Sequence, residues 1–168
     1  RLSTKDLDIL QDAREIKGLL GYLPESAPLY PDMLVYDFLR FIASVQGLGA
    51  SRRQQRIEHL ADLCGIREVM HRSIGELSKG YRQRVGLANT LVHDPDVLIL
   101  DEPTTGLDPT PIIEIRELIR EIGRERTVVL STHILPEVEA TCSRVLIINR
   151  GKVVASGTPE ELAERSIG

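Results

Sequence analysis

Tryptophan is absent and cysteine is rare in this sequence of 168 residues. The two cysteines, Cys64 and Cys142, lie far apart and form neither a CxxC pair nor a cluster with histidines at metal-ligand spacing. This pattern excludes a disulfide-rich scaffold and a structural zinc site, because both need several closely spaced cysteines. We expect two reduced, buried thiols in a cytosolic protein, and neither is a candidate nucleophile.

Long apolar runs and an excess of basic residues are also lacking. No run approaches the roughly 20 apolar residues that cross a bilayer, and the polar start at Arg1 has no signal-peptide pattern. Any role at a membrane is therefore expected to act through a partner. The formal net charge is -4, whereas a nucleic-acid-binding surface usually carries a clustered basic excess. We therefore expect no nucleic-acid partner.

Hydrophobic residues make up 42% of the sequence, which is enough for the core of one globular domain. Such a domain can have two lobes. From residue 97 onward, short aliphatic runs alternate with amphipathic segments. The runs lie at 97–100, 127–130 and 145–148. This alternation is typical of a parallel sheet covered by helices, so the sequence predicts an α/β fold.

A helix is predicted between the first two strands. Thr110 is a candidate N-cap, Pro111 is tolerated in a first turn, and Gly123 is placed to end the helix. Isoleucines recur at helical spacing, at positions 112, 115, 119 and 122. This helix should therefore cover one face of the sheet.

The C-terminal end of the sequence has the pattern of a hairpin. A turn at 149–151 leads from the third strand into residues 152–156. A last short helix is then expected from Glu160.

The stretch from about residue 30 to residue 91 contains no convincing strand. Its apolar residues recur at helical spacing over 35–45, 57–64 and 77–91. We interpret this stretch as a helical lobe inserted into the α/β core.

Three prolines, Pro24, Pro28 and Pro31, precede the lobe and favour extended backbone, which predicts a hinge. The chain would then consist of a first part of the core (1–29), a helical subdomain (30–91) and a second part of the core (92–168).

Two adjacent carboxylates follow the aliphatic strand at 97–100. Asp101 and Glu102 would lie at its carboxyl end, where open α/β sheets bind ligands. Asp101 is suited to hold Mg²⁺, and Glu102 is suited to accept a proton from water that attacks a phosphate. Solvated acids are also common at strand ends, so this pair alone leaves both interpretations open.

A histidine follows the next strand. The run at 127–130 ends in Ser131-Thr132-His133, and parallel neighbouring strands would bring His133 and Glu102 to the same edge. A neutral imidazole there could donate to a γ-phosphate oxygen or orient the attacking water. An isolated histidine is more often a cap or simply exposed, but the position of this one after a strand favours the site.

A third motif lies upstream, where Ser78, Lys79 and Gly80 precede an apolar-periodic helix. Ser78 would cap this helix. A helix N-terminus with a serine hydroxyl, an unshielded glycine amide and a lysine favours anions, although an ordinary capped helix has the same pattern.

Together these motifs resemble the nucleotide-binding domain of ABC transporters, in the same order and spacing across nearly the whole chain. Leu77-Ser78-Lys79-Gly80-Tyr81 matches the signature motif, residues 98–102 match Walker B, Gly106-Leu107-Asp108 matches the aspartate loop, and His133 matches the switch histidine. The resemblance implies a P-loop NTPase (RecA-like) parallel-sheet core with an inserted α-helical subdomain.

The resemblance also implies roles for these residues, with ATP and Mg²⁺ as cofactors. Asp101 would hold Mg²⁺, Glu102 would be the catalytic base, and His133 would contact the γ-phosphate. Ser78 and Gly80 would contact the nucleotide of the opposite protomer in a head-to-tail dimer, and Asp108 would lie at that interface.

The sequence departs from the family pattern at three positions. Lys79 replaces the first glycine of the signature pair, and Tyr81 replaces its glutamine. Ser78 and Gly80 retain the anion-binding pair, and Lys79 adds positive charge. Glu25 stands where the family has the glutamine that reaches Mg²⁺, and its carboxylate is still able to ligate the metal. In having a glutamate in this loop, the sequence resembles an exporter-like subfamily.

No G-x-x-x-x-G-K-[ST] motif occurs in the 168 residues, so the N-terminal part with the phosphate-cradling P-loop is missing from the sequence. Residues 1–8 resemble the segment that follows the P-loop helix. We expect this chain alone to bind ATP weakly and to hydrolyse none, because it lacks the amides and the lysine that hold the phosphates. Two explanations of the missing motif stay open: a truncated chain, or an N-terminal part that exists but is disordered without nucleotide.

The function implied by the resemblance is that of an ATP-binding subunit coupling ATP hydrolysis to transport. Its partners would be transmembrane permease subunits, with candidate contacts at Leu29, Tyr30 and Met33, and a second nucleotide-binding domain, identical or not. It would be cytoplasmic, on the inner face of the cell membrane. Two alternatives are a non-transport ABC ATPase, disfavoured by the short lobe, and a degenerate regulatory domain, disfavoured by the intact Asp101, Glu102 and His133.

Overall fold

The computed structural model describes residues 12–165. The chain forms two compact units, of which the first ends at Ser131 and the second begins at Thr132. Each unit is described below by itself.

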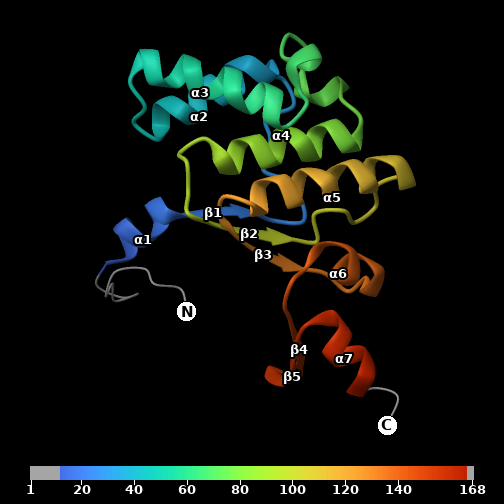
Figure 1. The fold of residues 1–168 in the computed structure, drawn as a ribbon. Coiled ribbons are helices and arrows are strands. Elements are labelled where there is room, and N and C mark those ends of the chain that lie inside the picture. The colour runs from blue at the N-terminus through green and yellow to red at the C-terminus, as the bar shows by residue number, and fades with distance from the viewer. Residues whose placement is uncertain (1–11, 166–168) are drawn as a thin grey trace. The chain divides into compact units, whose positions relative to one another are not determined.

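The first unit contains a three-stranded parallel sheet (Figure 1). Its strands are β1 (Leu20–Leu23), β2 (Val97–Asp101) and β3 (Thr127–Ser131), in the order β1-β2-β3. Leu23 lies opposite Leu100, which in turn lies opposite Leu130, so all three strands end at the same edge. The predicted strands at 97–100 and 127–130 are therefore confirmed as parallel neighbours.

Strand β1 is not predicted from the sequence, because it has only four residues and includes a glycine. The structure explains that glycine. A Cβ atom on Gly21 would lie 2.6 Å from Leu98 Cδ2 and 2.7 Å from the carbonyl oxygen of Thr90. Gly21 therefore allows β1 to lie close to both β2 and the following helical layer.

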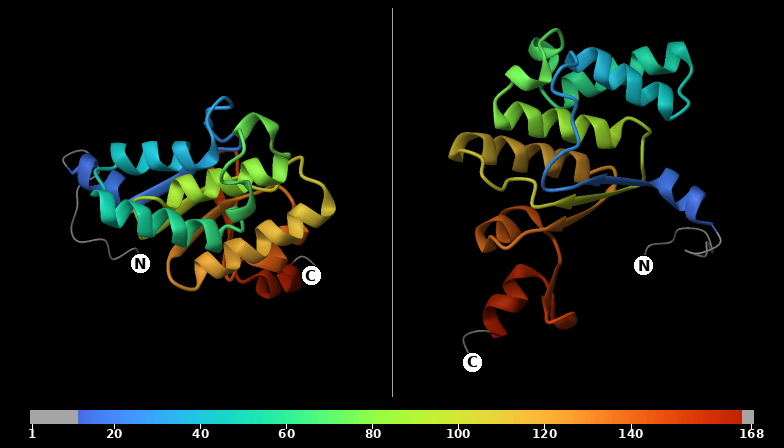
Figure 2. Two further views of the ribbon diagram at one scale, coloured as in Figure 1. Left: turned by 90° about the horizontal axis from the view of Figure 1, so that it is seen from above. Right: turned by 180° about the vertical axis from the view of Figure 1, so that it is seen from behind.

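Helices form two layers over one face of this sheet (Figures 1 and 2). The layer next to the sheet contains α4 (Lys79–Leu91) and α5 (Pro109–Gly123), and the outer layer contains α2 (Val35–Val45) and α3 (Ala50–Leu63). Two short 3-10 turns, η1 (Arg67–Val69) and η2 (Ile74–Glu76), connect α3 to α4, and α1 (Ala13–Leu19) precedes β1. The helical segment expected over 30–91 is thus present and contains α2, α3 and α4.

One continuous core joins these layers. Phe38 of α2, Leu60 of α3, Leu87 of α4 and Leu100 of β2 are fully buried in the same cluster. Burial of an aliphatic or aromatic side chain contributes on the order of 2 kcal/mol each, so this core holds the helical layers on the sheet.

Helix α5 begins two residues earlier than expected. Its first residue is Pro109 and its N-cap is Asp108, so the predicted cap at Thr110 is wrong. Proline fits the first helical position because its missing N–H would have no partner there. The predicted apolar stripe is confirmed at Ile115, Ile119 and Ile122, which are buried.

The second unit contains a hairpin between two helices. Its elements are α6 (Leu135–Thr141), β4 (Val145–Asn149), β5 (Lys152–Gly157) and α7 (Pro159–Arg165). The hairpin is confirmed. The expectation that its first strand belongs to the parallel sheet is wrong, because within residues 12–165 β4 pairs only with β5, antiparallel. Arg150 and Gly151 have positive φ angles of 49° and 74°. Such angles suit a tight hairpin turn, which returns the chain immediately onto β4.

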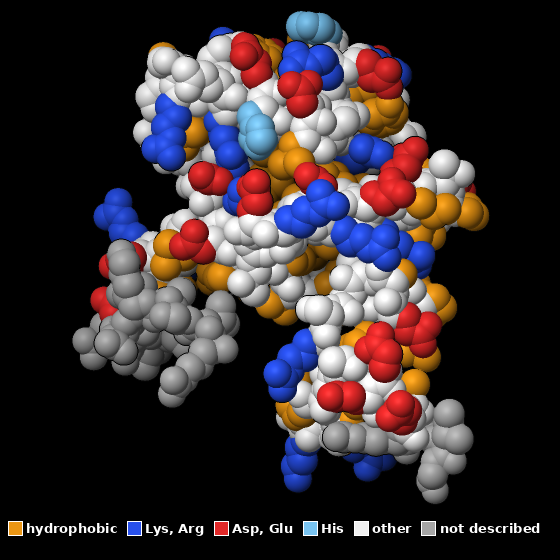
Figure 3. Space-filling model, in the orientation of Figure 1, with side chains coloured by type: hydrophobic (Ala, Val, Ile, Leu, Met, Phe, Trp, Pro, Cys, Tyr) orange, Lys and Arg blue, Asp and Glu red, His pale blue; other side chains and the backbone are white. Residues whose placement is uncertain are grey.

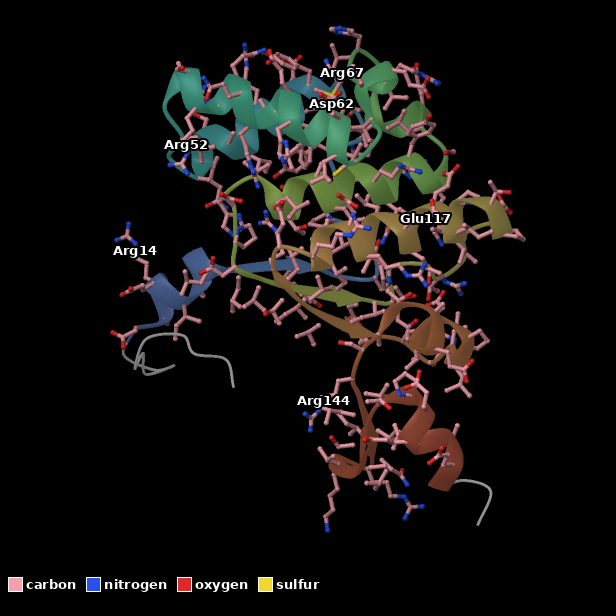
Figure 4. All side chains as sticks on the ribbon, viewed as in Figure 1. Arg14, Arg52, Asp62, Arg67, Glu117 and Arg144 are labelled. Carbon is pink, nitrogen blue, oxygen red and sulfur yellow. The ribbon has the colours of Figure 1, made fainter. Side chains whose placement is uncertain are left out.

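Opposite charges are interleaved on the helical layers of the first unit (Figure 3). Arg67 and Asp62 illustrate this, with Nε 2.5 Å from Oδ1 on an exposed part of the surface (Figure 4). The hydrogen bond from Arg67 lowers the pKa of Asp62.

Candidate active site

The carboxyl end of β2 places Asp101 at the common edge of the three strands. Asp101 is the last residue of β2 and lies opposite Ser131 of β3. The Ser131 hydroxyl donates a hydrogen bond to Asp101 Oδ1. The carboxylate is partly exposed, so this bond restricts its orientation while leaving it accessible from the edge.

Glu102 follows immediately and has an unusual backbone. Its φ angle is +47°, in the left-handed region that side chains other than glycine rarely adopt. Three hydrogen bonds hold it there: the Glu102 amide donates to the Ser131 oxygen at 3.0 Å, the Thr105 amide donates to the Glu102 oxygen at 3.1 Å, and Thr105 Oγ1 donates to Glu102 Oε2 at 3.0 Å. Backbone strain of about 1–3 kcal/mol persists where neighbouring contacts fix the conformation, and such residues cluster at active sites.

His133 lies in the second unit, two residues after β3 ends, and is exposed. A hydrogen-bonded turn shapes its backbone, because Thr132 Oγ1 accepts from the Ile134 amide at 3.1 Å and donates to Glu137 Oε2 at 2.9 Å. Glu137 is only 1% exposed, so this turn is anchored in its unit. The proximity of His133 to Glu102 remains a prediction.

The start of α4 is open to solvent, and Ser78 caps it as predicted. Ser78 Oγ accepts a hydrogen bond from the Tyr81 amide at 3.3 Å, and the side chains of Ser78 and Lys79 are exposed. Free amides at a helix N-terminus favour an anion, and the lysine ammonium strengthens that preference.

Lys79 has a partner that the sequence does not indicate. Its Nζ donates to the backbone oxygen of Thr105 at 2.7 Å. The start of α4 is thereby joined to the loop that follows Glu102.

Tyr81, at the glutamine position of the signature motif, is also held within the chain. Its hydroxyl donates to Glu68 Oε1, and this hydrogen bond raises the pKa of Tyr81. One turn further, Arg84 Nη2 lies 2.7 Å from Glu114 Oε2 of α5, and Arg84 Nη1 donates to the oxygen of Cys64 at 2.9 Å. These contacts connect the first two turns of α4 to its neighbours.

Two further predicted residues lie at loop positions. Asp108 is exposed and is the N-cap of α5, where a carboxylate is favoured by the helix dipole. Glu25 is exposed and follows β1 by two residues. Because Leu23 lies opposite Leu100, Glu25 emerges from the same edge of the sheet as Asp101 and Glu102.

The chemistry of these side chains fits Mg²⁺ with a phosphate ligand. Carboxylate oxygens are hard ligands, and Mg²⁺ is usually held by one or two carboxylates, phosphate oxygens and water rather than by a complete protein cage. Within residues 12–165 no group of three or more His, Cys, Asp or Glu side chains forms a metal cluster. Asp101, with Glu102 beside it, matches the sparse type of site.

Two residues of this edge are not singled out by the sequence. Thr105 and Ser131 orient the two carboxylates through their hydroxyl groups. Their only signal in the sequence is that each is a hydroxyl residue close behind a strand end, which is too common a pattern to identify them.

The comparisons with known proteins agree with this geometry. The sequence profile of the family described as ABC transporter matches residues 1–105. The ABC transporter ATP-binding protein NatA of Bacillus subtilis is 38% identical over 165 residues, which cover 97% of this chain and 67% of NatA. The ABC transporter ATP-binding protein YxlF of the same species is 35% identical over 159 residues, covering 95% of this chain and 54% of YxlF.

A solved structure shows the same fold. CbiO1 of Clostridium perfringens, described as part of the ABC transporter complex cbiONQ, has a TM-score of 0.88 and 30% sequence identity, covering 98% of this chain and 68% of CbiO1. The chain therefore spans about half to two thirds of the length of these three proteins. Among residues 12–165, no helix combines the length and the apolar character that crossing a membrane requires.

Proposed function

The chain belongs to the ABC transporter family, and we propose that it supplies part of an ATP-binding subunit, which couples ATP binding and hydrolysis to transport through partner transmembrane subunits. The observation that carries this proposal is the placement of Asp101 and Glu102 together at the carboxyl edge of a parallel sheet. Ligands of open α/β sheets bind at this edge.

In the proposed reaction Glu102 accepts the proton of the water that attacks the γ-phosphate. The hydrogen bond from Thr105 Oγ1 occupies one side of Oε2 and fixes the carboxylate, so the remaining lone pairs are directed in advance. Asp101 would hold Mg²⁺, which would supply positive charge to neutralise the phosphate oxygens. The Ser131 hydroxyl keeps Asp101 oriented for this task.

Two further residues, His133 and Glu25, are assigned roles toward the nucleotide through the resemblance of their motifs. His133 donates to the γ-phosphate or positions the water, and the turn formed by Thr132 supports its backbone. Glu25 would ligate the metal or its water from the loop after β1, and the common edge of β1 and β2 supports this role.

The start of α4 serves the nucleotide of a second protomer. Ser78 and Lys79 are exposed and Gly80 is partly exposed, and together they provide donors and a positive charge. Asp108 would lie at the interface. The exposed Ser78 side chain at the N-terminus of α4 supports this assignment, because helix N-termini favour anions.

The permease contact is proposed at the beginning of the helical layer. Tyr30 is 52% exposed and Phe41 is 45% exposed, and the ring of Tyr30 lies 6.2 Å from that of Phe41 and 5.8 Å from that of buried Phe38. Leu29 and Met33 are partly buried against the core, so Tyr30 is the candidate most available to a partner. Through this partner the subunit would lie on the cytoplasmic face of the cell membrane.

Residues 1–168 alone should bind ATP weakly and hydrolyse none. This part of the proposal rests on the missing G-x-x-x-x-G-K-[ST] motif, whose amides and lysine hold the phosphates in P-loop proteins.

The test uses the intact protein assembled with its transmembrane subunits. Mg²⁺-dependent ATPase activity should fall at least about 100-fold in Glu102→Gln, because general-base catalysis contributes about 10²–10⁴-fold, while ATP binding is retained. Glu117→Gln, at an exposed position of α5, is the matched control and should keep full activity. Unchanged turnover in Glu102→Gln would overturn the assignment of the base.

A further inference from the structure

The side chain of Lys79 is exposed, and its end contacts its own chain at Thr105. Its Nζ donates to the Thr105 backbone oxygen at 2.7 Å. Thr105 in turn binds Glu102 twice, through its amide to the Glu102 oxygen at 3.1 Å and through Oγ1 to Oε2 at 3.0 Å. A continuous chain of hydrogen bonds therefore runs from the start of α4 to the carboxylate of Glu102.

The loop between these residues is shaped to admit the lysine. A Cβ atom on Gly106 would lie 2.3 Å from Lys79 Nζ, and Gly106 has a φ angle of +68°. The ammonium group occupies the space that any other side chain at position 106 would need. Glycine at this position therefore allows the hydrogen bond to Thr105 to form.

Neighbouring contacts hold the start of α4 next to the start of α5. A Cβ atom on Gly80 would lie 3.2 Å from Pro111 Cβ, so the two helix starts are closely packed. Arg84 of α4 pairs with Glu114 of α5 at 2.7 Å. The flexible lysine thus bridges two segments that are already fixed next to each other, which reduces the entropy lost when its side chain is ordered.

We propose that Lys79 is a positioning residue for catalysis: it fixes Thr105, and Thr105 fixes the carboxylate of Glu102. This inference rests on the proposed function of Glu102 as the base. In the proposed head-to-tail dimer, Ser78 and Gly80 face the nucleotide of the other protomer. The Lys79–Thr105–Glu102 chain therefore connects contact with one nucleotide to the base that acts on the other.

The experiment compares Lys79→Met, Lys79→Arg and the control Lys17→Met in the intact transporter. Lys17 is exposed on α1. Loss of the hydrogen bond to Thr105 should lower kcat about 10-fold in Lys79→Met, because displacement of a catalytic group by a fraction of an ångström has effects of this order. Because Lys79 also adds positive charge at the start of α4, KM for ATP should rise, but by less than kcat falls, and Lys79→Arg should recover most of kcat.

A second measurement does not depend on turnover. Amide hydrogen exchange of the peptide covering 102–108 should be at least about 10-fold faster in Lys79→Met than in the wild type, in nucleotide-free protein. The Lys17→Met control should leave this peptide unchanged. Gly106→Ala should reproduce the same exchange and kcat changes by displacing the ammonium group.

The outcomes separate the two proposals. Absence of ATPase in the wild-type transporter, or no effect of Glu102→Gln, overturns the proposed function. Normal ATPase with an unchanged kcat in Lys79→Met overturns the positioning role of Lys79. A rise in KM with constant kcat also overturns it, since that result would show that Lys79 only binds nucleotide.

Discussion

The backbone amide of Glu102 donates to the carbonyl oxygen of Ser131 at 3.0 Å. The pairing of β2 and β3 thus continues one residue past Asp101, and it holds Glu102 in a left-handed conformation at φ +47°. The same contact that extends the sheet therefore sets the direction of the proposed base.

This strained backbone predicts that glycine is more stabilising than alanine at position 102, the reverse of their order in a helix. Both variants remove the carboxylate, but only glycine adopts a positive φ without a steric cost. We expect Glu102→Gly to be about 1 kcal/mol more stable to urea unfolding than Glu102→Ala. At the exposed helical position Glu117, the alanine variant should instead be the more stable by about 1 kcal/mol. Equal stabilities of the two position-102 variants would contradict the strain.

The hydroxyl of Ser131 should affect metal affinity more than nucleotide affinity. Ser131→Ala removes the hydrogen bond that orients Asp101, and loss of such an outer partner typically weakens metal binding about 10–100-fold. In the intact transporter the Mg²⁺ concentration for half-maximal ATPase should rise by about 10-fold. Ser131→Thr retains a hydroxyl and serves as the control. An unchanged Mg²⁺ dependence in Ser131→Ala would argue against Asp101 as the metal ligand.

Asp94 should contribute to stability through two arginines. Its Oδ1 lies 2.9 Å from Arg56 Nη2 and 3.1 Å from Arg126 Nη1, whose side chains are only 15% and 13% exposed. Burial alone would raise the pKa of Asp94, but the two positive charges outweigh it and lower the pKa. Asp94→Asn should cost about 1–2 kcal/mol, less than a fully buried pair because Asp94 is 49% exposed.

The pair of Asp62 and Arg67 is the matched control for that variant. Both side chains are at least 60% exposed, so Asp62→Asn should change stability by less than about 0.5 kcal/mol. Equal effects of the two variants, measured by urea unfolding, would contradict the role of burial.

The contribution of Asp94 to stability should also depend on pH. It should be present at neutral pH and lost as the pH falls below about 4, the ordinary aspartate range.

Cys64 should be inert to thiol reagents in the native state. Burial raises the pKa of its thiol to about 12, so almost no thiolate exists at pH 8. Cys142 is partly exposed and has a raised pKa as well. With a chromogenic disulfide reagent at pH 8, Cys142 should react slowly, and Cys64 only upon unfolding. Rapid reaction of two thiols in the native protein would contradict the burial of Cys64.

The same burial gives a pH dependence above neutrality. A thiol with a pKa of about 12 in the folded state and about 8.5 in the unfolded state keeps its proton longer when folded. Its contribution to stability is therefore complete below about pH 8.5 and is lost as the pH rises toward 12. Cys64→Ala should remove this part of the decrease in the free energy of unfolding with rising pH, measured by urea unfolding at a series of alkaline pH values.

Strands β2 and β3 and the apolar face of α5 are predictable from the sequence, because aliphatic runs and isoleucine spacing encode them directly. Strand β1 is not, since four residues with Gly21 show no strand pattern and only the space between Leu98 and Thr90 reveals why a glycine is there. The sequence gives two conflicting signals for β4. The alternation of strands and helices predicts a place in the parallel sheet, whereas the turn at Arg150 and Gly151 predicts pairing with β5, and the structure has the second.

The chemical identity of Asp101 and Glu102 follows from the sequence, but their orientation does not. That orientation depends on hydrogen bonds from Ser131, Thr105 and Lys79. These residue types are common, and the bonds follow no fixed spacing along the chain, so no sequence pattern identifies them. Such contacts emerge only when the strand edge and the helix starts are placed together.

The space shared by Lys79 and Gly106 has an evolutionary consequence. Because an ammonium group stands where a Cβ atom at position 106 would be, the two positions should covary among homologues. Lineages with lysine in the signature motif should retain glycine at the equivalent of position 106, whereas lineages with glycine in place of that lysine keep only the backbone restriction of φ +68° and should accept asparagine or aspartate there. An ancestral exchange at one position would thus have made the other permissive, and the order of the two substitutions should be recoverable from a phylogeny.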